Sequence, residues 1–155
     1  MALYSAAPII SGGISMVTAT PGRNDPQLGQ RITFGNKDYV YIYNAGGSDI
    51  PPSWGCVPAA GASNCSATLS SALYDTVLGV CQHTTIPAAS YGWVAYRGVV
   101  NVYASAAIAA GAFMTVGANG IFTTYVCGTT GKEIGKFLTV ASAATGVTGT
   151  AYISV

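Results

Sequence analysis

The alternation of residue types along the chain predicts β-strands almost throughout. The clearest run covers residues 38–44, in which three tyrosines alternate with Val40 and Ile42. Because successive side chains of a strand point to opposite faces, the aliphatic pair is expected to be buried and the tyrosines to form the second face. This tyrosine face is a candidate contact surface, since tyrosine is enriched at protein interfaces; a half-exposed sheet face is the alternative. Its members are Tyr39, Tyr41 and Tyr43.

Similar patterns recur along the rest of the chain. Asn119 and Gly120 predict a hairpin, because both residue types accept the positive φ that a tight two-residue turn requires. The alanine-rich residues 104–112 lack a polar face and are interpreted as a connection rather than a helix. The chain is therefore predicted to be all-β, a single compact β-barrel or sandwich-like module. Further strands are predicted at residues 76–81, 91–96, 99–103, 113–116, 121–126, 134–140 and 150–155.

The length of 155 residues suits one domain. Residues 14–155 are predicted to form the β domain, and residues 1–13 an extended N-terminal arm. Residues 51–70 are rich in Pro, Gly, Ala and Ser, and they are predicted to leave the β core as a long loop. Loops of this length usually carry function. Trp54 lies in this loop and is a second candidate for contact with a partner.

A weak repeat occurs at residues 50–57, 86–94 and 108–116. Each copy starts with isoleucine, continues with small or turn-forming residues, and then places an aromatic residue at the entry to a strand. Proline pre-sets φ and small residues permit a tight corner, so repeated use of one corner chemistry accounts for the pattern. Duplication of a segment is the alternative, but the spacings between the copies are unequal.

The charge content is unusually low. Only 7% of the residues are charged, against roughly 25% in an average soluble domain. The net charge is +1 and the cations are scattered, so no nucleic-acid partner is expected. No membrane span is expected either, because the longest apolar stretch is about 13 residues and a span needs about 20. A surface with so little charge should self-associate, which predicts a homo-oligomer; a monomer coated with small polar residues is the alternative.

Signals of enzyme chemistry are nearly absent. His83 is the single histidine, and the carboxylates form no pair suited to general acid and base work. Cys81 and His83 would share a strand face, but two ligands do not make a structural zinc site, which uses four. We therefore expect no catalytic residues, no metal and no cofactor.

Four cysteines are present, without the spacing of a zinc ribbon. Cys56 and Cys65 lie in one loop and could form a disulfide, which would stabilise the fold by roughly 2–3 kcal/mol in the chain-entropy model. Free, half-buried thiols are the alternative. Cys81 and Cys127 fall on predicted strands and are expected to be packed.

Several stretches in order resemble the small capsid decoration, or cement, proteins of tailed bacteriophages, including those of cyanophages. No single motif is specific, and the order and spacing of the motifs carry the resemblance, which covers about residues 28–50 and 75–155. The motifs are LGQRI at 28–32, DYVYIYNAGG at 38–47, YGWVAYRGV at 91–99, AIAAGA at 107–112 and IGKFLT at 134–139.

The resemblance implies a structural virion protein, made in the host cytoplasm and bound to the capsid exterior. Its implied partners are the major capsid protein and further copies of itself, most often as a trimer, and the family has no active site to carry over. A receptor- or glycan-binding fibre or spike module is the alternative from a different class. In that reading the aromatic residues Trp54, Tyr91 and Trp93 would stack on sugars.

The N-terminal residues 1–10 are the main candidate for a capsid clamp. They carry no charge, and they could add a strand to a neighbouring protein, with main-chain hydrogen bonds supplying affinity. A disordered terminus is the alternative. The apolar residues expected to make the contact are Leu3, Tyr4, Ile9 and Ile10.

Overall fold

A computed structural model describes residues 17–21, 26–61, 65–69, 76–127, 133–139 and 147–155. Across these ranges ten strands form one sheet, and the helical content is a single 3-10 turn, η2 (Ala118–Gly120). The strands are β1 (Arg31–Phe34), β2 (Lys37–Asn44), β3 (Gly55–Pro58), β4 (Ser66–Thr68), β5 (Gly79–Cys81), β6 (Tyr91–Ala104), β7 (Phe113–Val116), β8 (Phe122–Thr124), β9 (Gly135–Phe137) and β10 (Val147–Ser154). The all-β prediction is confirmed. No helix of the described residues is long and apolar enough to cross a membrane.

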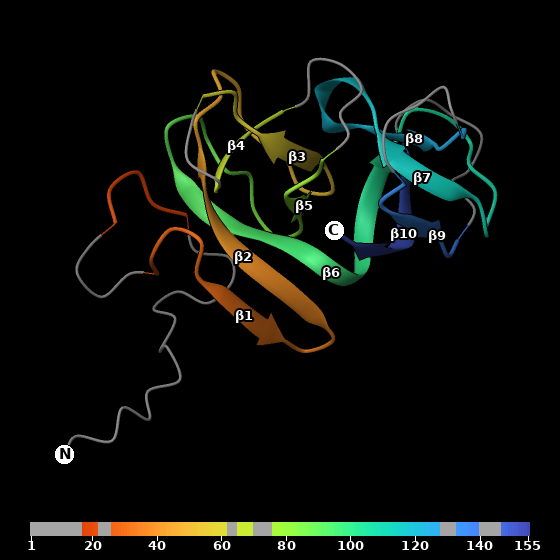
Figure 1. The fold of residues 1–155 in the computed structure, drawn as a ribbon, viewed down its shortest axis with the longest axis horizontal. Helices are drawn as coiled ribbons and strands as arrows, with labels where there is room; N and C mark the ends of the chain where they lie inside the picture. The colour runs from red at the N-terminus through yellow and green to blue at the C-terminus, as the bar shows by residue number, and fades with distance from the viewer. Residues whose placement is uncertain (1–16, 22–25, 62–64, 70–75, 128–132, 140–146) are drawn as a thin grey trace.

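The sheet folds back on itself in two closed circuits that share β6. One circuit runs β2–β4–β3–β5–β6 and returns to β2; the other runs β6–β10–β9–β7–β8 and returns to β6. Each circuit closes through a short parallel pairing, β2 with β4 in the first and β6 with β8 in the second. The result is a sandwich-like body rather than a regular barrel. Figure 1 shows β6 running through both halves, with β1 on the outer side of β2.

β6 changes partner near its middle. Residues 91–98 pair with β2, and residues 97–104 pair with β10. Gly98 sits at the change with φ +111°, a conformation that favours glycine, and a Cβ there would clash with the Asn36 carbonyl oxygen. Two separate strands were predicted here, and the structure joins them into one. Gly98 makes this possible because it lets the strand bend without losing continuity.

The core consists of two clusters of buried side chains, one on each side of β2. Val40 and Ile42 belong to the smaller cluster, which confirms their predicted burial. Tyr39 and Tyr41 belong to the larger cluster, which extends through both circuits. Both faces of β2 are therefore covered, so the predicted tyrosine face is not a surface at these two positions.

The segment 51–70 was predicted to be a loop, and this is wrong at two short stretches. It supplies β3 and β4, which together close the first circuit. At Gly55 a small residue is required by close packing, since a Cβ there would lie 2.9 Å from side-chain atoms of Val116 and Phe122. This glycine is therefore explained by the close approach of neighbouring chain segments.

The three copies of the sequence repeat adopt the same corner. In each, a buried isoleucine precedes a turn whose third residue after it has positive φ, and a strand starts two residues later. The positive-φ residues are Ser53, Ala89 and Gly111, with φ of 70°, 55° and 87°. Two of the isoleucines, Ile50 and Ile86, also hydrogen-bond each other's backbone at 2.9 and 3.0 Å. Repeated corner chemistry is therefore real, and Pro26 with Gly29 before β1 repeats it without the isoleucine.

The predicted hairpin at residues 117–120 is confirmed. β7 and β8 are antiparallel, and η2 connects them. Asn119 and Gly120 take φ of 58° and 75°, as the Asn-Gly signal requires. The connection at 105–112 contains no helix, also as predicted.

Candidate contact surface

The second circuit leaves one face of its sheet uncovered. The inward residues of β10 and β9, among them Ile153 and Phe137, are buried in the larger cluster. The residues between them point to solvent because side chains alternate along a strand. Register places Phe113, Lys136 and Tyr152 side by side across β7, β9 and β10.

We call this surface the open face. Its large apolar side chains are well exposed, at 47% for Phe113, 47% for Leu138 and 42% for Tyr152. Leu138 follows β9 directly, and its amide donates to the Thr150 carbonyl at 2.8 Å. Exposed apolar side chains gathered on one face, rather than scattered, are typical of an interaction site. The open face consists of Phe113, Lys136, Leu138 and Tyr152, with the half-buried Val99 at its β6 border.

The cations of the open face are held against aromatic rings. The Lys136 ammonium lies 5.5 Å from the centre of the Phe113 ring. The Arg97 guanidinium donates a hydrogen bond to the Tyr152 hydroxyl, and this bond, with Asp38 nearby, raises the pKa of Arg97. Such contacts orient long side chains along the surface and keep the rings accessible. The face thus combines flat apolar area with cations whose side chains are held along the surface.

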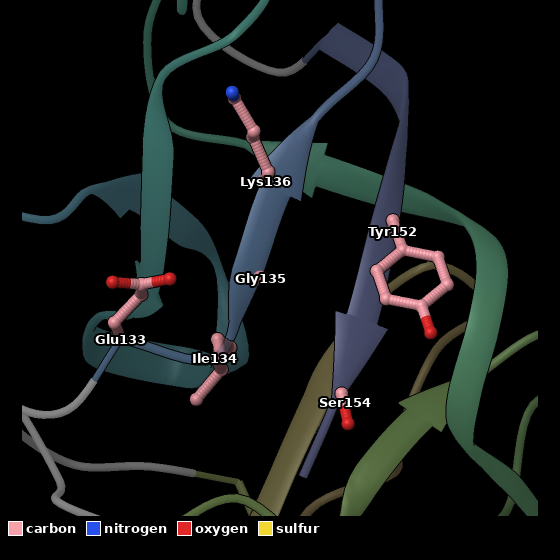
Figure 2. A pocket seen from close by; sticks show the side chains of 6 residues that line it. All are labelled: Glu133, Ile134, Gly135, Lys136, Tyr152 and Ser154. Atoms are coloured by element: carbon pink, nitrogen blue, oxygen red, sulfur yellow. The ribbon is translucent and has the colours of Figure 1, made fainter.

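A shallow depression of about 190 Å³ marks the β9–β10 part of this face. Glu133 and Lys136 lie at its rim with their charged groups pointing to different sides, and Tyr152 stands on the neighbouring strand (Figure 2). Gly135 lets β9 and β10 approach closely at this point, because a Cβ there would clash with the Tyr152 carbonyl oxygen. The depression has the size and lining to receive a side chain of a partner protein.

The structure does not bring the predicted contact residues together. Tyr43 is half-buried and packs on Tyr91, with ring centroids 4.7 Å apart. Trp54 is half-buried and stacks on Tyr103 at 5.4 Å, in another part of the fold. Tyr39 and Tyr41 lie in the core, as described above. The remaining candidates, Leu3, Tyr4, Ile9 and Ile10, lie outside the described residues.

The aromatic trio expected for sugar binding is also dispersed. Trp93 is buried in the larger cluster, where its ring lies 5.0 Å from that of Tyr41. Only Trp54 and Tyr91 are partly exposed. They cannot form one aromatic platform with Trp93.

The cysteines are free thiols in the described residues. Cys56 does not pair with Cys65; its thiol donates to the Gly79 carbonyl at 3.4 Å, and burial raises its pKa far above the ordinary value. Burial likewise raises the pKa of Cys81 to about 12, which fits its predicted packing in a strand. Cys127 was also expected to be packed, and this is wrong. β8 ends at Thr124, so Cys127 lies beyond the strand and is exposed.

His83 lies beside the core rather than in a site. Its Nε2 is 3.2 Å from the Tyr39 hydroxyl, and burial together with nearby Lys37 lowers its pKa. Among the described residues, no group of three or more His, Cys, Asp or Glu side chains is placed to hold a metal ion.

The open face was missed by sequence reasoning, although a signal for it exists. In β10 the outward positions are Thr148, Thr150, Tyr152 and Ser154, which alternate with small or apolar residues. In residues 38–44 the same alternation is plain because one face holds three tyrosines and the other Val40 and Ile42. In β10 the signal is weaker and consists of Tyr152, an aromatic residue among polar outward positions.

No protein-family model and no curated protein sequence matches this chain. Its fold is similar to a solved structure, the N base of the head fibre protein gp8.5 of bacteriophage phi29. The two share 18% sequence identity with a TM-score of 0.53, and the match covers 75% of this chain and 94% of the fibre base. At that identity the comparison shows that the two chains share a fold.

Proposed function

We propose that this chain is a structural protein of a bacteriophage virion that binds the outer surface of the capsid and stabilises the shell. The open face carries the proposal. It is the part of the described fold where large apolar side chains gather in the open on a rigid sheet. The likeness to a head-fibre base and the sequence resemblance to decoration proteins both support a place on the phage head.

In the proposed mechanism, the free energy of binding holds neighbouring coat subunits together. Fully burying a large apolar side chain contributes about 1.5–3 kcal/mol. Phe113, Leu138 and Tyr152 are each about half exposed, so each has roughly half of that amount left to gain on a partner. A copy that spans two coat subunits must be released before they separate, which raises the free energy of opening the shell. This work needs no catalytic residue and no cofactor.

The open face carries charged groups that could pair with opposite charges on a coat surface. Arg97 and Lys136 are exposed, with Asp38 near Arg97 and Glu133 in the depression beside Lys136. Because exposed charges are screened by salt, binding is expected to weaken between low and high ionic strength. The apolar side chains should retain a part of the affinity at high salt.

Co-sedimentation with purified undecorated heads tests the proposal. Leu138→Ser removes an apolar side chain from the open face, and Leu28→Ser is a matched control, since Leu28 is 43% exposed in the turn before β1. We expect Leu138→Ser to weaken head binding about tenfold, equivalent to about 1.4 kcal/mol, and Leu28→Ser to leave it nearly unchanged. Equal binding by both variants would place the capsid contact elsewhere.

A fibre base is the second candidate, favoured by the likeness to the base of the phi29 head fibre. In that case the chain would attach a longer projection to the head rather than act alone. Electron microscopy of virions carrying a labelled copy would separate the two. A compact knob supports decoration, and a filament that continues outward from the label supports a fibre.

A further inference from the structure

β1 is the one strand of the described sheet that has a single neighbour. Every other strand pairs with at least two, because the two circuits close. β1 pairs with β2 alone, and it lies outside both circuits (Figure 1). Alternate main-chain N–H and C=O groups of an edge strand face away from its partner and can accept a further strand.

β1 lacks three of the usual protections of an edge. Natural edges are blunted by lysine, proline or a bulge, and the sequence Arg-Ile-Thr-Phe has none of these, although the strand is short and carries Arg31. Its apolar end is conspicuous, since Phe34 is 60% exposed, more than any other large apolar residue described. A segment added along β1 would cover this ring.

The charges beside this edge are already engaged. The Arg31 guanidinium lies 5.0 Å from the centre of the Tyr96 ring. The Thr33 hydroxyl donates to the Asp38 carboxylate at 2.7 Å. The edge therefore offers main-chain groups and an apolar ring, and its arginine already lies against an aromatic ring. It suits an extended, uncharged segment.

We propose that the β1 edge binds the N-terminal segment, residues 1–16, of a second copy of this chain as an added strand. This deepens the self-association part of the proposed function. The segment has the required chemistry, since residues 1–22 contain no charged side chain and Ile9 and Ile10 are β-branched. Its length is ample, because 16 extended residues reach about 50 Å and the four residues of β1 span about 13 Å.

The position at which this segment joins the fold favours a second copy over the same chain. Thr18 is fixed to Tyr91 by two backbone hydrogen bonds, of 3.2 and 2.7 Å. β6 and β2 both lie between that point and β1, since Tyr91 pairs with β2 and β2 with β1. Residues 19–30 already lead from Thr18 to β1, so residues 1–16 would have to cross β6 and β2 a second time to reach β1 of their own copy. The β1 edge of a neighbouring copy can be reached without that crossing.

Each copy then has one donor segment and one acceptor edge. Such a head-to-tail contact closes into a ring when the rotation between copies allows it, which accommodates a trimer. The acceptor strand β1 pairs with β2 in the first circuit, whereas the open-face residues lie on β7, β9 and β10 and beside them. Self-association and capsid binding therefore use different residues, and each can be removed without the other.

Solution mass measurements on the full chain and three variants test the proposal. Phe34→Ser alters the edge, deletion of residues 2–13 removes the donor, and Phe113→Ser is the matched control on the open face. We expect the full chain and Phe113→Ser to form the same oligomer at micromolar concentration. The deletion should be monomeric, and Phe34→Ser should raise the dissociation constant at least about tenfold.

A second measurement guards against misfolded variants and identifies the occupant. A synthetic peptide of residues 1–16 added to the deleted protein should slow hydrogen exchange at alternate amides of β1. A full chain that stays monomeric with those amides protected would mean that the segment binds its own copy, and would overturn the proposal. An oligomer unaffected by the deletion, or lost in Phe113→Ser but not in Phe34→Ser, would also overturn it. The head-binding test with Leu138→Ser stands apart, because it reports on the open face alone.

Discussion

The two circuits that share β6 treat the two faces of their sheets differently. In the first, β2 has Tyr39 and Tyr41 on one face and Val40 and Ile42 on the other, and all four are buried. In the second, β10 buries its inward residues and presents Thr148, Tyr152 and Ser154 to solvent. Strict alternation is present in both strands. What differs is whether a second cluster covers the other face.

The comparison explains why the second circuit is the better candidate for binding. A strand with large residues on both faces needs two layers of packing, and the short strands β3, β4 and β5 with their connections provide the second layer in this fold. A strand whose outward positions are mostly polar needs only one. An aromatic residue among those outward positions lies outside the core clusters, which makes it the better candidate for contact with a partner.

Replacing one aliphatic residue in each half should give the largest difference in the free energy of unfolding. Ile42→Ala removes a fully buried side chain from the smaller cluster and should reduce the free energy of unfolding by about 2–5 kcal/mol. Leu138→Ala trims a half-exposed side chain on the open face and should change it by less than about 0.5 kcal/mol. Urea denaturation followed by circular dichroism measures both. Similar losses in the two variants would mean that the halves do not differ in how they are covered.

The junction between the halves should be the next most sensitive point. Gly98→Ala places a Cβ against the Asn36 carbonyl oxygen at a φ of +111°. Either β6 or the turn between β1 and β2 must then move. We expect a loss of about 1–3 kcal/mol. Gly47→Ala is the matched control, because a Cβ there meets nothing within 4 Å and its φ is not positive. Thermal unfolding measures the loss of stability in both variants. Equal losses would show that β6 does not need a glycine at position 98 to bend.

Much of this fold could be predicted from the sequence, and the failures share a cause. The alternation of β2, the Asn-Gly turn and the burial of Ile42 follow from local rules of strands and turns. The burial of Tyr39 and Tyr41 depends on a second layer that comes from distant strands, which no local pattern reports. The prediction of a loop at residues 51–70 failed for the same reason. The glycine at position 55 is required by Val116 and Phe122, which are distant in the sequence, and a local pattern does not report them.

The open face could be predicted only in part. Its strands were identified, but the faces of β7, β9 and β10 could not be joined without the register that places Phe113 beside Lys136 and Lys136 beside Tyr152. Likewise, the open edge of β1 could not be predicted from the sequence of β1 alone. It exists because both circuits close without this strand, which depends on the pairing of all the others.

The smallest expected effect is a dependence on pH at the border of the first circuit. His83 is the only histidine, and its pKa is lowered by burial and by Lys37, so the folded chain binds its proton less readily than the unfolded chain does. The unfolded state therefore holds more protons as the pH falls below about 6.5, and stability must decrease in that direction. The effect should be small because the side chain is largely exposed. Urea midpoints between pH 7.5 and pH 5.5 measure it.

His83→Gln should flatten this dependence, since it leaves the chain without a histidine that titrates in that window. Lys37→Gln keeps the histidine and removes the nearby positive charge, so the pKa of His83 should rise toward its ordinary value and the dependence should become weaker without vanishing. The two variants together separate the contribution of burial from that of charge. A slope that persists in His83→Gln would show that another group governs the pH response. A midpoint that rises on acidification would show that the pKa of His83 is not lowered in the folded chain.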